Sequence, residues 1–145
     1  MSTVAFVFAR GGSKGLPRKN IKNLNGKPLL VHSIDLAKEI SEISRIFVST
    51  EDQEIALIAK EAGAEVIKRP DDLAEDDTPE ILAWKHALET ICKNNIMCTK
   101  FVSIPTTAPL RTVGDVQSCL DLFDESTDVV ITVSDSHRNP FFNMV

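Results

Sequence analysis

The sequence contains no run of apolar residues that approaches the roughly 20 needed for a helix to cross a bilayer. Its N-terminus, Met1 to Val4, also lacks the basic segment and the long apolar segment of a secretory signal peptide. These absences predict a protein with no membrane partner, and we expect a cytoplasmic location. At 145 residues the chain is long enough to bury a core, and it is expected to form one domain, residues 1–145.

Cysteine is scarce, and its spacing excludes two common kinds of cysteine site. Cys92, Cys98 and Cys119 are odd in number and include no Cys-x-x-Cys pair. Neither a zinc site nor a disulfide framework is therefore indicated. Each cysteine is expected to pack as a small apolar residue in a reducing compartment.

Acidic residues are absent from the segment Met1 to Leu30, although the whole chain has a net charge of −5. The net negative charge argues against general nucleic-acid binding. This N-terminal segment holds six cations, whereas the remainder holds ten basic and all 21 acidic side chains, a net of −11. A localised positive site on an acidic body suits a small anionic ligand. The six cations are Arg10, Lys14, Arg18, Lys19, Lys22 and Lys27.

Apolar runs of strand length alternate with amphipathic segments of helix length along the whole chain. The predicted strands span residues 4–9, 45–50, 64–68, 100–104 and 128–134. The predicted helices span residues 28–43, 52–62, 78–94 and 112–123. This alternation predicts an α/β fold with a doubly wound, mostly parallel sheet and helices on both faces.

Several helix ends are marked by residues with known capping preferences. Asp52 is expected to cap the second helix and Gly63 to follow its end. Thr78 is expected to cap the third helix, with Pro79 in its first turn. The inward face of that third helix is predicted to comprise Ile81, Leu82, Trp84, Ala87, Leu88 and Ile91.

In a doubly wound sheet, ligands bind outside the carboxyl ends of the strands. Five loops are predicted to lie there: residues 10–20, 51–52, 69–79, 105–111 and 135–140. We expect these loops to converge on one crevice, with Arg10, Arg69 and Arg111 on the same face.

The loop at residues 10–20 (RGGSKGLPRKN) combines three glycines with four cations. Glycines allow positive φ and close backbone approach, and successive N–H groups can form a concavity that binds anions. Basic side chains around such a concavity indicate a polyphosphate, most simply a nucleoside triphosphate. The alternative is a solvated basic loop. The loop lacks the Gly-x-Gly-x-x-Gly dinucleotide fingerprint, and no Walker A pattern fits it.

Residues 10–20 resemble the N-terminal loop of acylneuraminate cytidylyltransferases, the CMP-sialic acid synthetases. A member of the legionaminate or pseudaminate type is as plausible as one for N-acetylneuraminate. The resemblance continues in the family's order through residues 25–29 (NGKPL), 48–52 (VSTED), 68–70 (KRP), 76–79 (DDTP) and 108–111 (APLR). It implies a Rossmann-like nucleotide-diphospho-sugar transferase fold. It also implies transfer of CMP from CTP to the anomeric hydroxyl of a nine-carbon acidic sugar, with release of pyrophosphate, in carbohydrate biosynthesis of the lipopolysaccharide or capsule kind.

The resemblance also assigns residues to the two ligands. Arg10 and Lys19 are expected to act on the triphosphate during catalysis. Thr107 and Arg111 are expected to bind the acidic sugar. The nucleotide is expected to contact Arg10, Gly11, Gly12, Ser13, Lys14, Lys19, Asn20 and Arg69. Residue-level alternatives remain: an ion pair with Asp71 or Asp72 for Arg69, and a helix-flanking cation for Arg111.

Two departures from the family pattern limit what the resemblance implies. Pro105 stands where relatives commonly carry a glutamine that helps to hold the sugar, so the acid is open. Family members also continue past residue 145 into a segment that dimerises and supplies an acidic pair for Mg²⁺. We therefore expect a C-terminally truncated domain, Mg²⁺ as cofactor without ligands in this chain, and a homodimer when the full chain is present. Asp135 is the best local candidate for a metal contact.

Two other functions stay open. One is a cytidylyltransferase for the eight-carbon acid Kdo, which shares the loop. The other is a nucleotide-binding fragment without catalytic activity.

Overall fold

The structure, a computed structural model, describes residues 2–133. The chain divides into two compact units, residues 1–110 and residues 111–145.

The first unit is built on a parallel sheet of four strands in the order β5-β4-β1-β6. The strands are β1 (Thr3–Phe8), β4 (Ile43–Thr50), β5 (Glu65–Lys68) and β6 (Lys100–Ser103). From β1 the chain moves outward to β4 and β5, and then returns to place β6 on the other side of β1. This reversal is the mark of a doubly wound sheet, so the fold class predicted from the sequence is confirmed.

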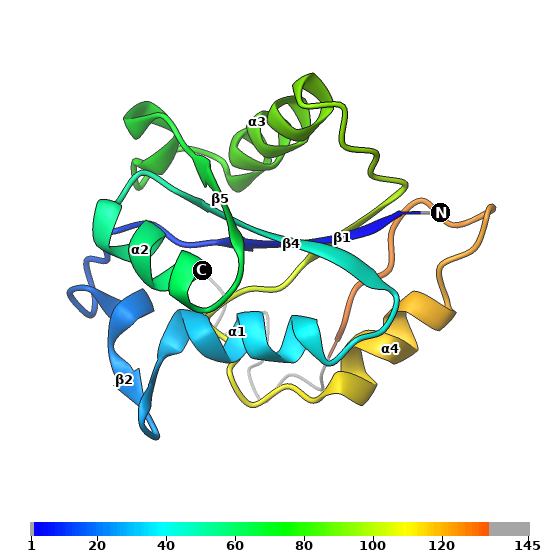
Figure 1. The fold of residues 1–145 in the computed structure, drawn as a ribbon, viewed down its shortest axis with the longest axis horizontal. Coiled ribbons are helices and arrows are strands. Elements are labelled where there is room, and N and C mark those ends of the chain that lie inside the picture. The colour runs from blue at the N-terminus through cyan, green and yellow to red at the C-terminus, as the bar shows by residue number, and fades with distance from the viewer. Residues whose placement is uncertain (1, 134–145) are drawn as a thin grey trace, which may run out of the picture. The chain divides into compact units, whose positions relative to one another are not determined.

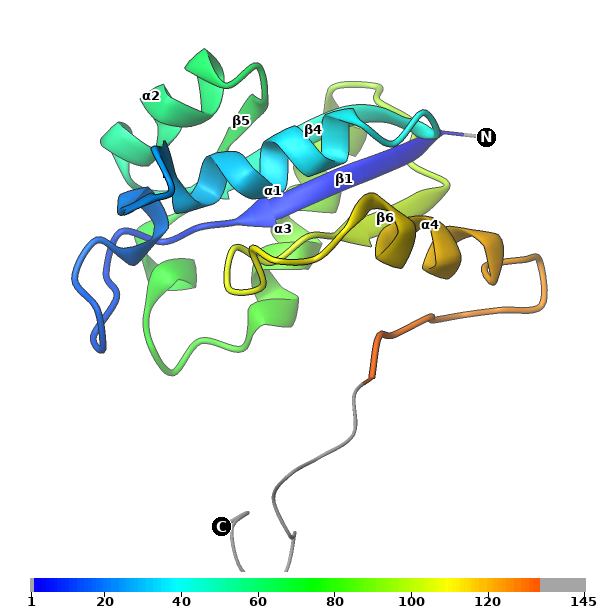
Figure 2. The same ribbon diagram turned by 90° about the horizontal axis from the view of Figure 1, so that it is seen from below.

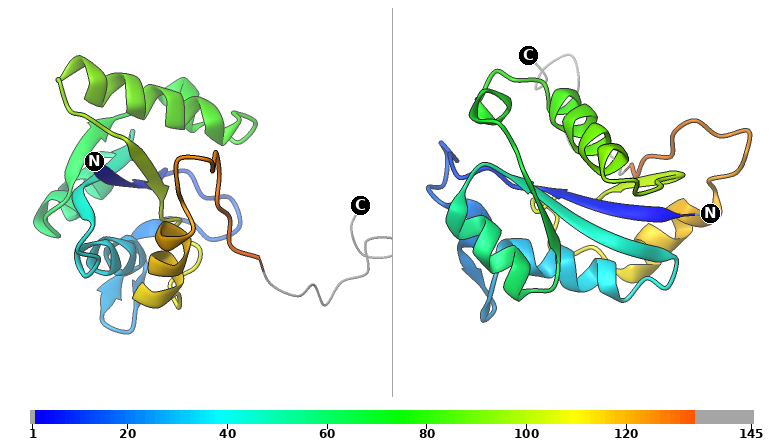
Figure 3. Two further views of the ribbon diagram at one scale, coloured as in Figure 1. Left: turned by 90° about the vertical axis from the view of Figure 1, so that its right-hand side faces the viewer. Right: turned by 45° about the horizontal axis from the view of Figure 1, so that its top comes forward.

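Helices cover both faces of this sheet (Figures 1 and 3). α1 (Leu29–Lys38) and α2 (Gln53–Glu61) lie on one face, and α3 (Glu80–Lys93) lies on the other. Figure 2 shows α1 running along β1. Because successive strand residues point to opposite faces, β1 serves both layers. Ala5 and Val7 pack with α1 and α2, whereas Val4 and Phe6 pack with α3.

A small hairpin separates β1 from α1. Its strands are β2 (Asn23–Leu24) and β3 (Lys27–Pro28), joined by Asn25 and Gly26. Both turn residues have positive φ, 51° and 88°, as a type I′ turn requires. The 3-10 helix η1 (Lys19–Ile21) precedes the hairpin, and a second, η2 (Asp71–Ala74), follows β5.

α1 ends at Lys38, earlier than predicted, because Ile43 has left the helix to pair with Thr3 at the start of β4. The turn that follows the helix is tight, with the Ile40 N–H donating to Ala37 O. The parallel ladder therefore takes residues that an amphipathic pattern alone assigns to the helix.

The predicted inward face of α3 is partly wrong. Ile81 and Leu82 are 52% and 42% exposed, while Ala83, Ala87 and Ile91 are buried. Trp84 packs against Phe8 and Phe101, with ring centroids 6.3 Å and 5.4 Å away. Ala83 is 1% exposed although it is small, and a search for large apolar residues does not detect it.

Thr78 does not cap α3, and that prediction is also wrong. The residue before the helix is Pro79, which makes no side-chain cap. The Thr78 hydroxyl instead donates to the Asp72 carbonyl at 2.8 Å and so braces η2.

The second unit contains α4 (Val113–Asp121), close to the predicted helix. Thr112 and Asp115 form a reciprocal capping box at its start, which fixes the beginning of the helix. The strand predicted at residues 128–134 is not formed over residues 128–133. No β-ladder among the described residues includes them, and Val129, Ile131 and Val133 are 73–85% exposed. Apolar composition without a pairing partner does not make a strand.

Within residues 2–133, no helix has both the length and the apolar character needed to cross a membrane. The three cysteines are free thiols, but Cys92 is exposed, so the expectation that each packs as an apolar residue is wrong there. Cys98 packs against the core beneath α3, and burial raises the pKa of its thiol.

Candidate functional site

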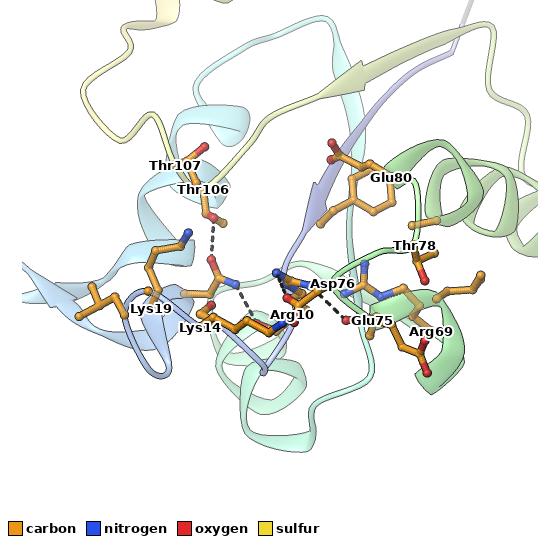
Figure 4. A pocket seen from close by; sticks show the side chains of 18 residues that line it. Arg10, Lys14, Lys19, Arg69, Glu75, Asp76, Thr78, Glu80, Thr106 and Thr107 are labelled. Carbon is orange, nitrogen blue, oxygen red and sulfur yellow. Dashed lines mark hydrogen bonds and ion pairs between the residues drawn. The ribbon is translucent and has the colours of Figure 1, made fainter. Parts of the chain in front are cut away.

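A cavity of about 560 Å³ lies in the first unit, at the carboxyl ends of β1, β5 and β6 (Figure 4). Its walls come from the loop at residues 10–20, the segment at residues 69–80 and the turn after β6. The crevice between β1 and β6 is where the strand order reverses, which is the position expected for a ligand in this fold. Convergence is therefore confirmed for these three loops.

The cavity is lined by four cationic side chains: Arg10, Lys14, Lys19 and Arg69. Arg10 and Lys14 share one carboxylate, with Arg10 Nη2 2.6 Å from Asp76 Oδ1 and Lys14 Nζ 2.5 Å from Asp76 Oδ2. The Lys14 ammonium, and then Arg10, hold the pKa of Asp76 below its usual range. Two cations thus already bind an anionic group across the cavity.

Lys19 lies on the opposite side of the cavity from Arg69, near Thr106 and Thr107 (Figure 4). No carboxylate pairs with its ammonium group among residues 2–133. Within that range, its charge is therefore the one of the four that is available to a ligand without first breaking an ion pair.

Asn20 ties the loop to the sheet. Its side chain is buried; Nδ2 donates to the Arg10 carbonyl at 2.9 Å, and Oδ1 accepts from the Thr106 hydroxyl at 2.6 Å. These bonds join the two ends of the loop and fix them to the turn that follows β6. Asn20 lines the cavity, but its amide already serves the architecture of the site.

Arg69 is 5% exposed and pairs with Glu51, whose Oε2 accepts from Arg69 Nη2 at 3.0 Å. The alternative of a pair with Asp71 or Asp72 is not what the structure shows. The other Glu51 oxygen, Oε1, accepts from the Gly11 N–H at 2.6 Å. Glu51 therefore links the loop at residues 10–20 to the buried Arg69. Arg69 Nε is buried without a hydrogen-bond partner in the described part of the chain.

The glycines of the loop do not act through positive φ. Among the described glycines only Gly26 and Gly63 have positive φ. Gly11 is needed for close approach instead, because a Cβ there would lie 2.5 Å from Asp52 Oδ2. Arg18, not a glycine, takes the left-handed conformation, with φ 56°.

The structure brings together most of the residues that the sequence assigned to the nucleotide. Of that set, the cavity lining includes Arg10, Ser13, Lys14, Lys19, Asn20 and Arg69, and it also includes Thr107, which was assigned to the sugar. Gly11 and Gly12 are not part of that lining, and the proposed contact of each with the nucleotide stays a prediction. Arg111 belongs to the second unit, so its contact with the sugar also stays a prediction, and Asp135 with the loop at 135–140 lies outside the described residues.

Sequence reasoning missed three residues that shape the site: Glu51, Asp76 and Thr106. The sequence places Asp76 only within the motif at residues 76–79 and Glu51 only within a loop. Glu51 could have been identified from its position, because it directly follows β4 at the carboxyl edge of the sheet, where ligands bind. No pattern in the sequence identifies Asp76 as the partner of two cations that lie far earlier in the chain.

The described residues offer no ready-made set of ligands for a resident metal. Among residues 2–133, no group of three or more histidine, cysteine, aspartate or glutamate side chains could hold an ion. Asp76 is engaged with Arg10 and Lys14 rather than with a second carboxylate.

Comparison with known proteins agrees with the geometry. Residues 4–100 match the family model described as "Cytidylyltransferase". The chain is 34% identical over 143 residues to post-translational flagellin modification protein B of Campylobacter coli, covering 96% of this chain. It is 32% identical over 143 residues to the N-acylneuraminate cytidylyltransferase of Streptococcus agalactiae, covering 97% of this chain. It is 34% identical over 124 residues to the pseudaminic acid cytidylyltransferase of Campylobacter jejuni, covering 85% of this chain.

Solved structures support the fold. One of CMP:2-keto-3-deoxy-manno-octonic acid synthetase complexed with CTP superposes with a TM-score of 0.69 at 21% identity, over 83% of this chain and 46% of that one. A cytidylyltransferase from Leptospira borgpetersenii superposes with a TM-score of 0.64 at 23% identity, over 85% of this chain and 49% of that one.

This chain spans 60% of the length of the Campylobacter coli relative, 34% of the streptococcal one and 53% of the Campylobacter jejuni one. The family model nevertheless covers well over half of the chain, and residues from the motifs at 10–20, 68–70 and 76–79 line one cavity. The chain belongs to the cytidylyltransferase family.

Proposed function

We propose that the cavity binds CTP and that the protein transfers CMP to the anomeric hydroxyl of an acidic sugar. The proposed acid is a nine-carbon acid of the N-acylneuraminate type, including pseudaminate and legionaminate. The names of the relatives, which include both N-acylneuraminate and pseudaminic acid cytidylyltransferases, support this class of substrate.

One observation carries the proposal. Four cationic side chains line a single cavity at the point where the strand order reverses, and two of them, Arg10 and Lys14, form ion pairs with the Asp76 carboxylate. A carboxylate and a phosphate present the same kind of anionic oxygen to arginine and lysine. The four cations outnumber the three acidic residues of the lining, Glu75, Asp76 and Glu80, and a net positive cavity suits the triphosphate of a nucleotide better than a neutral ligand.

The chemistry requires an in-line exchange at the α-phosphorus. A bond forms between the sugar's anomeric oxygen and the α-phosphorus, while the bond from that phosphorus to the bridging oxygen of the β-phosphate breaks. Pyrophosphate leaves with the electron pair of that bond, and the hydroxyl proton is released. Arg10, Lys14 and Lys19 are proposed to hold the triphosphate and to neutralise the charge that develops on pyrophosphate.

Further members of the site are proposed from position and resemblance. Thr107, exposed at the edge of the cavity, is proposed to contact the sugar with Arg111. Mg²⁺ is proposed as the cofactor of the reaction, although the described residues supply no set of ligands for it, and no step here depends on it. The homodimer and the cytoplasmic location expected from the sequence stay predictions.

A product assay tests the activity. The protein is incubated with CTP, Mg²⁺ and one acid at a time: N-acetylneuraminate, pseudaminate, legionaminate and Kdo. We expect pyrophosphate and a CMP-sugar with at least one of the nine-carbon acids. Product with Kdo alone would replace the proposed substrate, and CTP binding without product would favour a nucleotide-binding fragment.

The triphosphate assignment is tested by Lys19→Ala. Loss of a charged contact from a partly buried site is expected to weaken CTP binding by about 1.5–3 kcal/mol. The matched control is Lys22→Ala, which removes an exposed lysine of the same loop region that does not line the cavity. Calorimetry should show an unchanged dissociation constant for Lys22→Ala; an unchanged constant for Lys19→Ala would count against the assignment.

A further inference from the structure

The two ends of the loop at residues 10–20 meet on one carboxylate that does not belong to the cavity. Both oxygens of Asp52 bond the Arg18 guanidinium, with Nη2 to Oδ1 at 3.0 Å and Nη1 to Oδ2 closer still. Gly11, at the start of the loop, lies so near that its missing Cβ would be 2.5 Å from Asp52 Oδ2 and 3.1 Å from Arg18 Nη1. Asp52 thus bonds the end of the loop at Arg18 and lies against its start at Gly11.

Helix capping does not by itself account for Asp52. Its Oδ1 accepts from the Ile55 N–H at 2.9 Å and so begins α2. Serine and asparagine cap helices about as well as aspartate. Unlike serine or asparagine, aspartate also supplies a negative charge and two equivalent oxygens, which hold a guanidinium in bidentate geometry. The Arg18 guanidinium accordingly holds the pKa of Asp52 below its usual range.

The backbone at Arg18 is also in an uncommon conformation. Its φ of 56° is left-handed, which few residues other than glycine and asparagine adopt readily. This conformation turns the chain into η1, so that Lys19 and Asn20 line the cavity while the Arg18 side chain points back to Asp52. An ion pair at this place fixes the turn that presents Lys19.

We propose that Arg18 and Asp52 are positioning residues for the triphosphate, acting through the loop and not by contact with the ligand. This inference rests on the proposed function. Holding the loop closed before the nucleotide arrives removes part of the ordering cost of binding, so the pair raises affinity without touching CTP.

A merely structural role predicts a different pattern. The pair is partly exposed, with side chains 39% and 19% accessible, and ion pairs of this kind contribute little to folding stability. The clasp formed by Arg18 and Asp52 therefore predicts a large effect on CTP binding and a small one on the unfolding temperature. A structural role predicts that the two change together.

The test is a double-mutant cycle of Arg18→Ala and Asp52→Ser, measured by CTP calorimetry and thermal unfolding. Serine keeps the cap of α2 but is too short to hold the guanidinium. Each single variant is expected to raise the CTP dissociation constant about threefold to tenfold, and the double variant no further than either. Arg18→Lys is expected to restore part of the affinity, and Glu54→Gln, which alters only the exposed outer partner of Arg18, is expected to bind as the wild type.

The outcomes separate the two proposals. If the wild type binds CTP and Arg18→Ala and Asp52→Ser bind it equally well, the positioning role of the pair is overturned but the proposed function is not. Losses that add in the double variant, or that follow an equal loss of stability, also overturn the positioning role. Absence of CTP binding by the wild type overturns the proposed function, and the inference with it.

Discussion

Asp76 is the acidic residue that bears most directly on ligand binding in the cavity. Its carboxylate bridges Arg10 and Lys14, the same cations that are proposed to bind the triphosphate. A phosphate that uses them must compete with it. Asp76 is consequently both a member of the site and an internal competitor of its ligand.

Removing that competitor should strengthen binding. Asp76→Asn keeps the shape of the side chain but removes its charge, so we expect the CTP dissociation constant to fall severalfold at low salt. Asp77→Asn is the matched control, because it removes the adjacent charge, which forms no ion pair within the described part of the chain. Weaker CTP binding in Asp76→Asn, measured by calorimetry, would mean that Asp76 orients the two cations instead of competing for them.

At the scale of elements, the alternation of strands and helices and the position of the loops could be predicted because they depend on local patterns. The end of α1 could not, because it depends on Ile43 pairing with Thr3, which lies far earlier in the chain. The partner of Arg69 had the same difficulty: Glu51 is distant in sequence but adjacent across the sheet. Two uses of glycine were predicted for the loop, positive φ and close backbone approach; no glycine of the loop has positive φ, and Gly11 lies close to Asp52.

The corrected face of α3 makes a stability prediction. Ile91 is 1% exposed beneath the helix and Ile81 is 52% exposed on it. Ile91→Ala should cost about 2–5 kcal/mol, because it leaves a cavity in the core. Ile81→Ala should change the free energy of unfolding by no more than about 0.5 kcal/mol. Urea denaturation measures both, and similar costs at the two positions would show that the helix faces are assigned wrongly.

The start of α2 makes a prediction about pH. Because bonding to Arg18 lowers the folded-state pKa of Asp52, its contribution to stability is complete above its unfolded pKa of about 4. That contribution is lost as the pH falls through the lower folded-state value. Between about pH 6 and about pH 3, the wild type should therefore lose slightly more stability than Asp52→Ser, which cannot titrate there, in keeping with the small contribution of a partly exposed ion pair. Parallel curves of urea midpoint against pH for the two proteins would contradict the assignment.

At the scale of the whole molecule, the separation of charge is the dominant feature. The segment from Met1 to Leu30 carries six cations and no acid, on a chain whose net charge is −5. Of those cations, Arg10, Lys14 and Lys19 line the cavity, while Arg18 is neutralised by Asp52 and Glu54. The charge that the sequence localises to one end is thus divided by the fold between lining the cavity and holding the loop.

Charge-driven binding should weaken with salt, since ions screen the cations of an open cavity. We expect the CTP dissociation constant to rise between about 0.05 M and about 0.3 M sodium chloride, and to rise less in Lys19→Ala. The measurement is calorimetry at the two ionic strengths. Equal dependence on salt in both proteins would place Lys19 away from the triphosphate.

We propose that Arg10 and Lys19 hold a nucleoside triphosphate in this cavity. Calorimetric titration of CTP into the wild-type protein and into the Arg10→Ala/Lys19→Ala double variant tests it most directly. We expect saturable binding of CTP by the wild type. In the double variant we expect an affinity at least tenfold weaker, a loss of about 1.4 kcal/mol of binding free energy. Equal affinities in a double variant that remains folded, or no binding by the wild type, would contradict it.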